Sequence, residues 1–195
     1  MPDHYYTENP NSAHEERRVA VNALGNALTF ITDAGVFSRD GLDRGTELLL
    51  EALPPLSGRV LDLGCGWGAV GVALGKRWPE LEIVMTDINS RAVELARRNL
   101  AENGVKATVL QGDGFAAVEG CFDAIVTNPP IRTGKAVIYG LFAQARDYLT
   151  PDGALYVVIR KQQGAPSALK YLKEIYARAE TVDRASGFHV LRASL

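Results

Sequence analysis

From residue 59 to the C-terminus, short apolar runs alternate with amphipathic stretches. Apolar runs of this length between turn residues are typical of strands in a sheet. They predict strands over residues 59–63, 81–86, 106–110, 122–127 and 154–159, and a closing hairpin over 181–184 and 188–193.

The stretches between these strands carry apolar residues at helical spacing. Four helices are expected. The first runs from the turn at 64–68 to about Arg77, and the second from a Ser90 cap to a stop at 103–104. The third follows the apolar stripe 138–149 and ends at 150–153, and the fourth has Pro166 in its first turn. Strands that alternate with helices form parallel βαβ units. We therefore expect an α/β fold, a doubly wound and mostly parallel seven-stranded sheet.

Residues 1–58 follow a different pattern. Apolar runs at 19–21 and 28–31 predict a small hairpin around 25–26, and a loop over 35–45 follows. A helix through 48–53 ends at two prolines. Because this segment is too short for a core of its own, we expect an extension or lid on the main domain, residues 59–195.

Composition narrows the class of protein. A chain of 195 residues with 47% hydrophobic and 23% charged residues fits one soluble domain. The polar N-terminus has no apolar core typical of a signal peptide, and no run is long enough to span a bilayer. With two cysteines and no disulfide framework, we expect a cytoplasmic protein. The net charge of -2 argues against bulk coating of nucleic acid but leaves a local basic site open.

Candidate ligand-binding residues follow three of the predicted strands, where open α/β sheets bind their ligands. Asp62, Gly64, Gly66 and Gly68 belong to the first strand end, Asp87 to the second, and Asp113 and Gly114 to the third. Glycines let a backbone approach a ligand closely. A carboxylate after the second strand can accept hydrogen bonds from both ribose hydroxyls, and one after the third can accept from an adenine amino group. Together they indicate an adenosine-bearing ligand.

The glycine spacing distinguishes between cofactors. The dinucleotide fingerprint is G-x-G-x-x-G, whereas residues 64–68 read G-x-G-x-G after an acidic residue. Residues 59–195 therefore resemble the class I S-adenosylmethionine-dependent methyltransferases. The resemblance implies that residues 64–68 pack against the methionine and ribose of the cofactor. It also implies that Asp87 binds the ribose, that Asp113 lies near the adenine and that Ile88 contacts the adenine face.

The fourth strand ends in Asn128-Pro129-Pro130-Ile131. Prolines lack a backbone donor, so the loop presents carbonyl acceptors. The Asn128 side-chain oxygen and the Pro129 carbonyl can bind both hydrogens of an aromatic amino group and direct its lone pair toward a donor methyl. The N-P-P-aromatic motif is shared by methyltransferases of adenine N6, guanine N2 and glutamine amides. Here Ile131 replaces the aromatic residue and would pack on the base.

Three longer segments extend the resemblance. Residues 35–45, which read GVFSRDGLDRG, 128–135, which read NPPIRTGK, and 160–164, which read RKQQG, are similar to the small-subunit ribosomal RNA guanine-N2 methyltransferase family, the RsmC type. This resemblance implies guanine N2 of ribosomal RNA as the methyl acceptor. It also implies that Phe37, Asp43 and Gly45 lie over the cofactor together with Asn128, although Phe37 can equally be a buried packing residue. Larger members carry a second, degenerate methyltransferase domain.

Basic residues are expected at the same sheet edge, since they follow the fourth and fifth strands or belong to the upstream loop. They are Arg39, Arg132, Lys135, Arg160 and Lys161. Such a rim can bind RNA phosphates. Ribosomal RNA is thus the expected partner, and a monomer is compatible with this interpretation.

Two alternatives stay open. One is an N-methyltransferase for adenine N6, a glutamine amide or a small molecule, and the other is a non-catalytic RNA-binding module. Cys65 and Cys121 are expected as buried small residues, and His4, His14 and His189 have no metal-ligand spacing.

Overall fold

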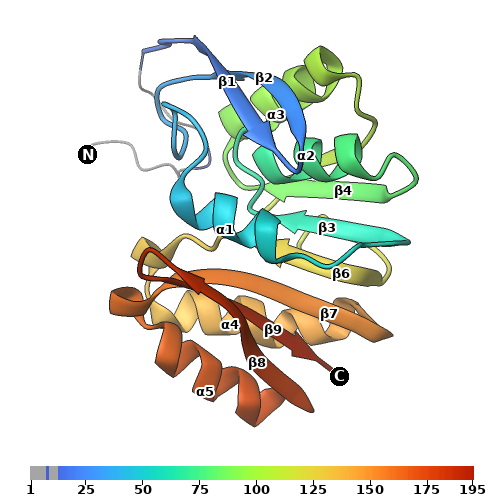
Figure 1. The fold of residues 1–195 in the computed structure, drawn as a ribbon, viewed down its shortest axis with the longest axis vertical. Helices are drawn as coiled ribbons and strands as arrows, with labels where there is room; N and C mark the ends of the chain where they lie inside the picture. Colours follow the sequence, from blue (N-terminus) through green and yellow to red (C-terminus); the bar gives the residue numbers. More distant parts are fainter. Residues whose placement is uncertain (1–7, 9–12) are drawn as a thin grey trace.

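The computed structural model describes residue 8 and residues 13–195, without the side chain of Arg132. Within this part, seven strands form one sheet in the order β5-β4-β3-β6-β7-β9-β8 (Figure 1). β9 runs antiparallel to both of its neighbours and the other pairs are parallel. The strands are β3 (Arg59–Leu63), β4 (Glu82–Asp87), β5 (Thr108–Gln111), β6 (Phe122–Thr127), β7 (Leu149–Arg160), β8 (Arg178–Ala185) and β9 (Phe188–Ser194). The predicted α/β fold is confirmed.

Helices cover both faces of this sheet. The helices are α1 (Arg44–Ala52), α2 (Ala69–Arg77), α3 (Ser90–Asn103), α4 (Lys135–Ala145) and α5 (Ala165–Ile175), with short 3₁₀ turns η1 (Ile131–Thr133), η2 (Arg146–Tyr148) and η3 (Lys161–Gln163). Val60 and Val126 join the core under α1, α2 and α3, whereas Leu61 and Ile125 join the core under α4 and α5. Because both faces are buried, the central strands read as continuous apolar runs.

The predicted N-terminal hairpin is confirmed, as β1 (Arg17–Ala23) paired antiparallel with β2 (Asn26–Thr32). Its free edge is covered by two amide side chains of α3. Asn99 accepts from the Ile31 amide at 2.7 Å and donates to the Ile31 carbonyl at 2.9 Å, and Asn103 makes the same two bonds with Thr29. The side chains thus replace a third strand, which protects an edge that would otherwise be open.

We expect Asn99→Ala to lower the free energy of unfolding by about 2–4 kcal/mol, because it leaves buried backbone groups of Ile31 and the Trp67 carbonyl without a partner. Chemical denaturation measures the change. Glu94→Ala, on the exposed side of α3, is the control and should cost less than about 0.5 kcal/mol. Equal effects of the two substitutions would contradict this account of the hairpin.

Several predicted boundaries were wrong. The cap of α3 is Asn89, not Ser90, since its side chain accepts from the amides of Arg91 and Ala92. α1 begins earlier than expected because Asp43 caps it. The apolar stripe at 138–149 spans three elements: α4 ends at Ala145, η2 follows, and Leu149 already belongs to β7, which continues through the expected helix stop at 150–153. No helix among the described residues is long and apolar enough to cross a membrane.

Candidate active site

A cavity of about 810 Å³ opens at the carboxyl ends of β3, β4 and β6, beneath the loop that joins β2 to α1. This is the sheet edge at which α/β folds bind ligands. Residues from every predicted strand end line the cavity: Asp62, Gly64, Gly66, Asp87, Ile88, Asp113, Gly114, Asn128, Pro129, Pro130 and Ile131. The structure therefore brings together the expected cofactor and catalytic residues, although Gly45 and Gly68 lie outside the lining.

The glycine-rich turn is held against the end of β4. The amides of Gly64 and Cys65 donate to the Thr86 carbonyl at 2.8 and 2.9 Å, and the Gly66 amide donates to Asp87 at 2.8 Å. Gly64 and Gly66 have φ of 73° and 54°, where side chains are disfavoured. A Cβ added at either glycine would meet no other protein atom within 4 Å. The turn thus leaves an open cradle beside its backbone, as a bound cofactor requires.

Asp62 lies at the floor of the cavity and is only 2% exposed. Burial raises the pKa of its carboxyl to about 7, and the nearby charge of Asp87 adds to the shift, although a hydrogen bond from the Gly71 amide opposes it. Burial also raises the pKa of Asp87. Two neighbouring carboxyls with raised pKa values, Asp62 buried and Asp87 half-buried, favour a cationic ligand, because a positive charge beside them restores the ionised form.

These shifts predict that binding of S-adenosylmethionine, which carries a sulfonium, depends on pH. The cation favours ionised Asp62, so below the free-state pKa of about 7 binding must release a proton. We expect affinity to fall by about tenfold for each pH unit below 7 and to level off above it. Calorimetry over this range, repeated in buffers of different ionisation enthalpy, measures affinity and proton release. Asp62→Asn should flatten the profile; a flat profile in the wild type would contradict the prediction.

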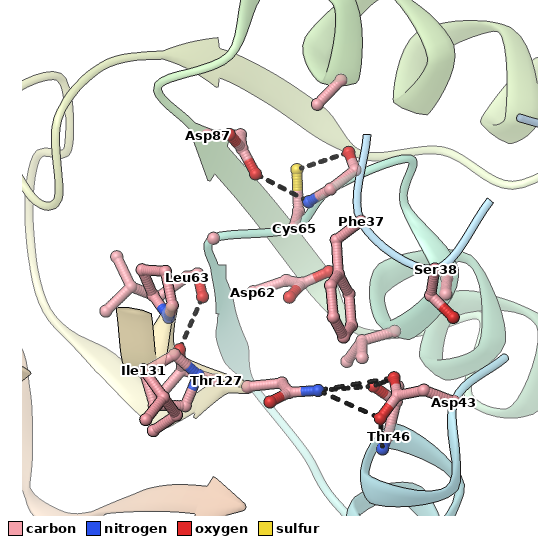
Figure 2. A pocket seen from close by; sticks show the side chains of 18 of the residues that line it. Phe37, Ser38, Asp43, Thr46, Asp62, Leu63, Cys65, Asp87, Thr127 and Ile131 are labelled. Carbon is pink, nitrogen blue, oxygen red and sulfur yellow. Dashed lines mark hydrogen bonds between the residues drawn. The ribbon is translucent and has the colours of Figure 1, made fainter. Parts of the chain in front are cut away.

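The loop over the cavity, residues 33–43, is anchored at several points. The Trp67 indole donates to the Phe37 carbonyl at 2.8 Å, and the side chains of Asn89 and Arg91 donate to the carbonyls of Gly35 and Ala34. Phe37 lines the cavity and remains 42% exposed, so the alternative of simple burial was wrong (Figure 2). The loop fixes one wall of the site.

Asn128 follows β6 and is held by α1. Its Nδ2 donates to the Thr46 hydroxyl at 2.9 Å and approaches the Asp43 carboxylate at 3.4 and 3.5 Å, bonds drawn at Asp43 and Thr46 in Figure 2. Asp43 lines the cavity, but its carboxylate also caps α1 through the Gly45 and Thr46 amides. Sequence reasoning missed Thr46; the signal was the D-x-x-T spacing of a helix cap.

Apolar and aromatic side chains also line the cavity. They are Ile131, Val137, Leu141 and Phe188 of β9, and of these only Ile131 was expected. The Arg160 guanidinium lies 4.7 Å from the centre of the Phe188 ring, so this predicted RNA contact lines the cavity as well. Phe188 is an isolated residue of the predicted closing hairpin, so the sequence did not indicate that it would line the cavity.

The other predicted basic residues differ in their surroundings. Lys135 and Lys161 are exposed and make no ion pair with any described residue, and Lys135 lies close to Gly164 beside η3. Arg39 forms an ion pair with Glu15 at 2.7 Å. The side chain of Arg132 lies outside the described part. Lys135 and Lys161 are therefore exposed at this edge of the sheet, without an ion-pair partner among the described residues.

Among the described residues, the cysteines and histidines form no second site. Cys65 is buried, and burial raises the pKa of its thiol well above the usual range, which makes it a poor nucleophile. Cys121 is exposed, so its expected burial was wrong. His14 pairs with Asp33, and His4 lies outside the described residues. Within the described part, no group of His, Cys, Asp or Glu could hold a metal ion.

A mostly parallel seven-stranded sheet, a G-x-G-x-G turn cradling a cavity and an N-P-P loop on the same cavity define a class I S-adenosylmethionine-dependent methyltransferase. The family comparison agrees, because the methyltransferase small domain matches residues 27–192. The chain belongs to this family.

Individual relatives fall into two groups. The chain is 36% identical to the uncharacterized protein YbxB of Bacillus subtilis, with 99% of this chain and 98% of that protein covered. It is 35% identical to ribosomal RNA small subunit methyltransferase C of Vibrio vulnificus, over 94% of this chain and 54% of the relative. A solved structure of the Thermus thermophilus 16S rRNA N2 G1207 methyltransferase (RsmC), with AdoMet and guanosine, matches at a TM-score of 0.83 and 30% identity, over 95% of this chain and 52% of that one. The chain thus spans about half the length of these two methyltransferases.

Proposed function

We propose that this chain transfers a methyl group from S-adenosylmethionine to guanine N2 of small-subunit ribosomal RNA. The observation that carries the proposal is the position of Asn128, Pro129 and Pro130 on the same cavity as the buried carboxylate Asp62 and the half-buried carboxylate Asp87. The names of the RsmC relatives support the acceptor. Such a substrate places the activity in the cytoplasm.

The chain's own residues hold the acceptor in position. When bound, S-adenosylmethionine supplies an electrophilic methyl group. The side-chain oxygen of Asn128 and the carbonyl of Pro129 accept hydrogen bonds from the two N–H groups of the amino group, which directs its lone pair into the cavity. Ile131 and Val137 offer an apolar surface for the base.

A transfer assay tests this function against both alternatives. The protein is incubated with cofactor carrying a tritiated methyl group and with separate RNA, DNA and protein fractions, and labelled RNA is digested to nucleosides. We expect label in RNA, as N2-methylguanosine. Label in DNA or protein, or on adenine, would support another N-methyltransferase. Cofactor binding without any transfer would support a non-catalytic module.

The exposed lysines at the sheet edge are proposed to bind RNA phosphates. Lys135→Ala and Lys161→Ala are each expected to weaken RNA binding and to reduce the slope of log affinity against log salt by about 0.7–0.9. Lys106→Ala is the control, since Lys106 is exposed at the opposite edge, ahead of β5. Fluorescence anisotropy across a salt series measures both quantities. An unchanged slope for both variants would remove these lysines from the proposed interface.

A further inference from the structure

Asn128 ends a chain of hydrogen bonds that begins in the N-terminal extension. The Asp43 carboxylate lies 2.5 Å from the Thr46 hydroxyl, and the hydroxyl lies 2.9 Å from Nδ2 of Asn128. We propose that Asp43 and Thr46 are positioning residues that fix which end of the Asn128 amide faces the methyl acceptor. This inference rests on the proposed function and assigns a task to α1.

The direction of the chain follows from counting protons. An ionised carboxylate can only accept hydrogen bonds, so the single hydroxyl proton of Thr46 must point at Asp43. The Thr46 oxygen can then only accept from Asn128. The amide group that faces Thr46 must therefore be NH₂, and Oδ1 is left to face the cavity.

The opposite orientation is electrostatically unfavourable. A rotated amide would place Oδ1 of Asn128 3.4–3.5 Å from the two Asp43 carboxylate oxygens, with no proton between them. It would also present NH₂ to the acceptor, and two amino groups that face each other cannot form the bond that orients the lone pair. The carboxylate of Asp43 thus selects the productive orientation.

The surrounding residues hold the Asp43 carboxylate and the Asn128 backbone in place. The Gly45 and Thr46 amides, at 2.9 and 3.2 Å, hold the Asp43 carboxylate as the cap of α1. A Cβ at Gly45 would lie 2.7 Å from the Phe188 ring, so a glycine lets α1 seat closely against β9. On the other side, the Thr127 hydroxyl fastens the end of β6 to the Leu63 carbonyl at 2.7 Å. Both ends of the hydrogen-bond chain are therefore fixed.

Two conservative substitutions disrupt the donor-to-acceptor direction of this hydrogen-bond chain. They preserve the cap of α1 and the side-chain volume. Asp43→Asn keeps a good helix cap but can donate to Thr46, which frees the hydroxyl proton to turn toward Asn128. Thr46→Val removes the hydroxyl. We expect each to lower kcat by about tenfold or more, because each removes an interaction that orients the acceptor, and we expect Thr46→Val, which leaves every carboxylate of the cavity in place, to keep the cofactor Kd within about twofold. Thr46→Ser, which keeps the hydroxyl, should have the kcat of the wild type.

A double substitution distinguishes loss of the Asn128 orientation from general damage to the site. In Asp43→Asn with Asn128→Asp, the carboxylate sits at the other end of the chain, and its second oxygen again presents an acceptor to the cavity. We expect the double variant to be more active than either single variant. A kcat within twofold of wild type for both Asp43→Asn and Thr46→Val, or a double variant no better than the singles, would overturn the inference.

A measurement without turnover keeps this test independent of the proposed function. In protein labelled with ¹⁵N at asparagine, the Asn128 side-chain NH₂ should show a nuclear Overhauser effect to the Thr46 methyl group, and Asp43→Asn should weaken it. NH₂ protons distant from Thr46 would overturn the inference. Absence of methyl transfer by wild-type protein that shows the effect would instead overturn the proposed function alone.

Discussion

Replacing Asn128 with alanine is expected to lower the rate of methyl transfer by about 100- to 1000-fold, the usual cost of removing a group that acts on the reacting atoms. The amide oxygen is one of two acceptors that the N-P-P loop offers to the amino group, and the two prolines that follow Asn128 carry no side-chain acceptor. Cofactor binding should change by less than about threefold, since the residues of the cradle are untouched.

Single-turnover transfer to RNA and calorimetry with the cofactor measure the two effects separately. Asn22→Ala, on an exposed position of β1, is the matched control and should behave as wild type in both. A variant that keeps more than a tenth of the wild-type rate, at unchanged cofactor affinity, would contradict the role of Asn128. Loss of both properties together would show that the substitution damages the fold.

The sequence predicted the sheet and the gathering of the three carboxylates at one cavity, because both depend on local patterns. Apolar runs mark the parallel strands, and a strand followed by an acidic or glycine-rich turn places its residues at one edge. Asp62, Asp87 and Asp113 could therefore be assigned to one cavity without knowledge of the strand order. The glycine turn added the conformational requirement that the positive φ values of Gly64 and Gly66 confirm.

Other parts of the cavity could not be predicted in the same way, because they are built from contacts between distant parts of the chain. Thr46 meets Asn128 across 82 positions of sequence. Phe188 lines the cavity from a hairpin that looked like a simple closing element, and it fixes Arg160 there. Charge patterning has the same limit: Arg39 was expected to face RNA, but a partner 24 residues away, Glu15, pairs with it.

Replacing Asp87 with alanine is expected to weaken cofactor binding by about 100-fold or more. An ionised carboxylate has about four acceptor positions. The amides of Gly66 and Asn89 occupy one on each oxygen, at 2.8 and 2.9 Å, and the Ile88 amide also donates to this carboxylate, which leaves about one position for a ribose hydroxyl. A hydrogen bond to a charged group contributes about 1.5–3 kcal/mol, and the Gly66 amide left without its partner costs a further ~1–3 kcal/mol, which together account for the expected change.

Asp87→Ala also loosens the cradle, since the Gly66 amide loses its partner. Asp87→Asn separates the loss of hydrogen bonding to the ribose from the loss of this contact with the Gly66 amide. Its side-chain oxygen can still hold one backbone amide, so we expect a smaller loss of about tenfold, in keeping with one charge-assisted hydrogen bond. Asp152→Ala, exposed near the start of β7 at the opposite edge of the sheet, is the control. Calorimetry with S-adenosylmethionine measures all three variants. An affinity of Asp87→Ala within threefold of wild type would mean that the cofactor's ribose lies elsewhere, and the orientation of the cofactor between Asp87 and Asn128 would have to be reversed.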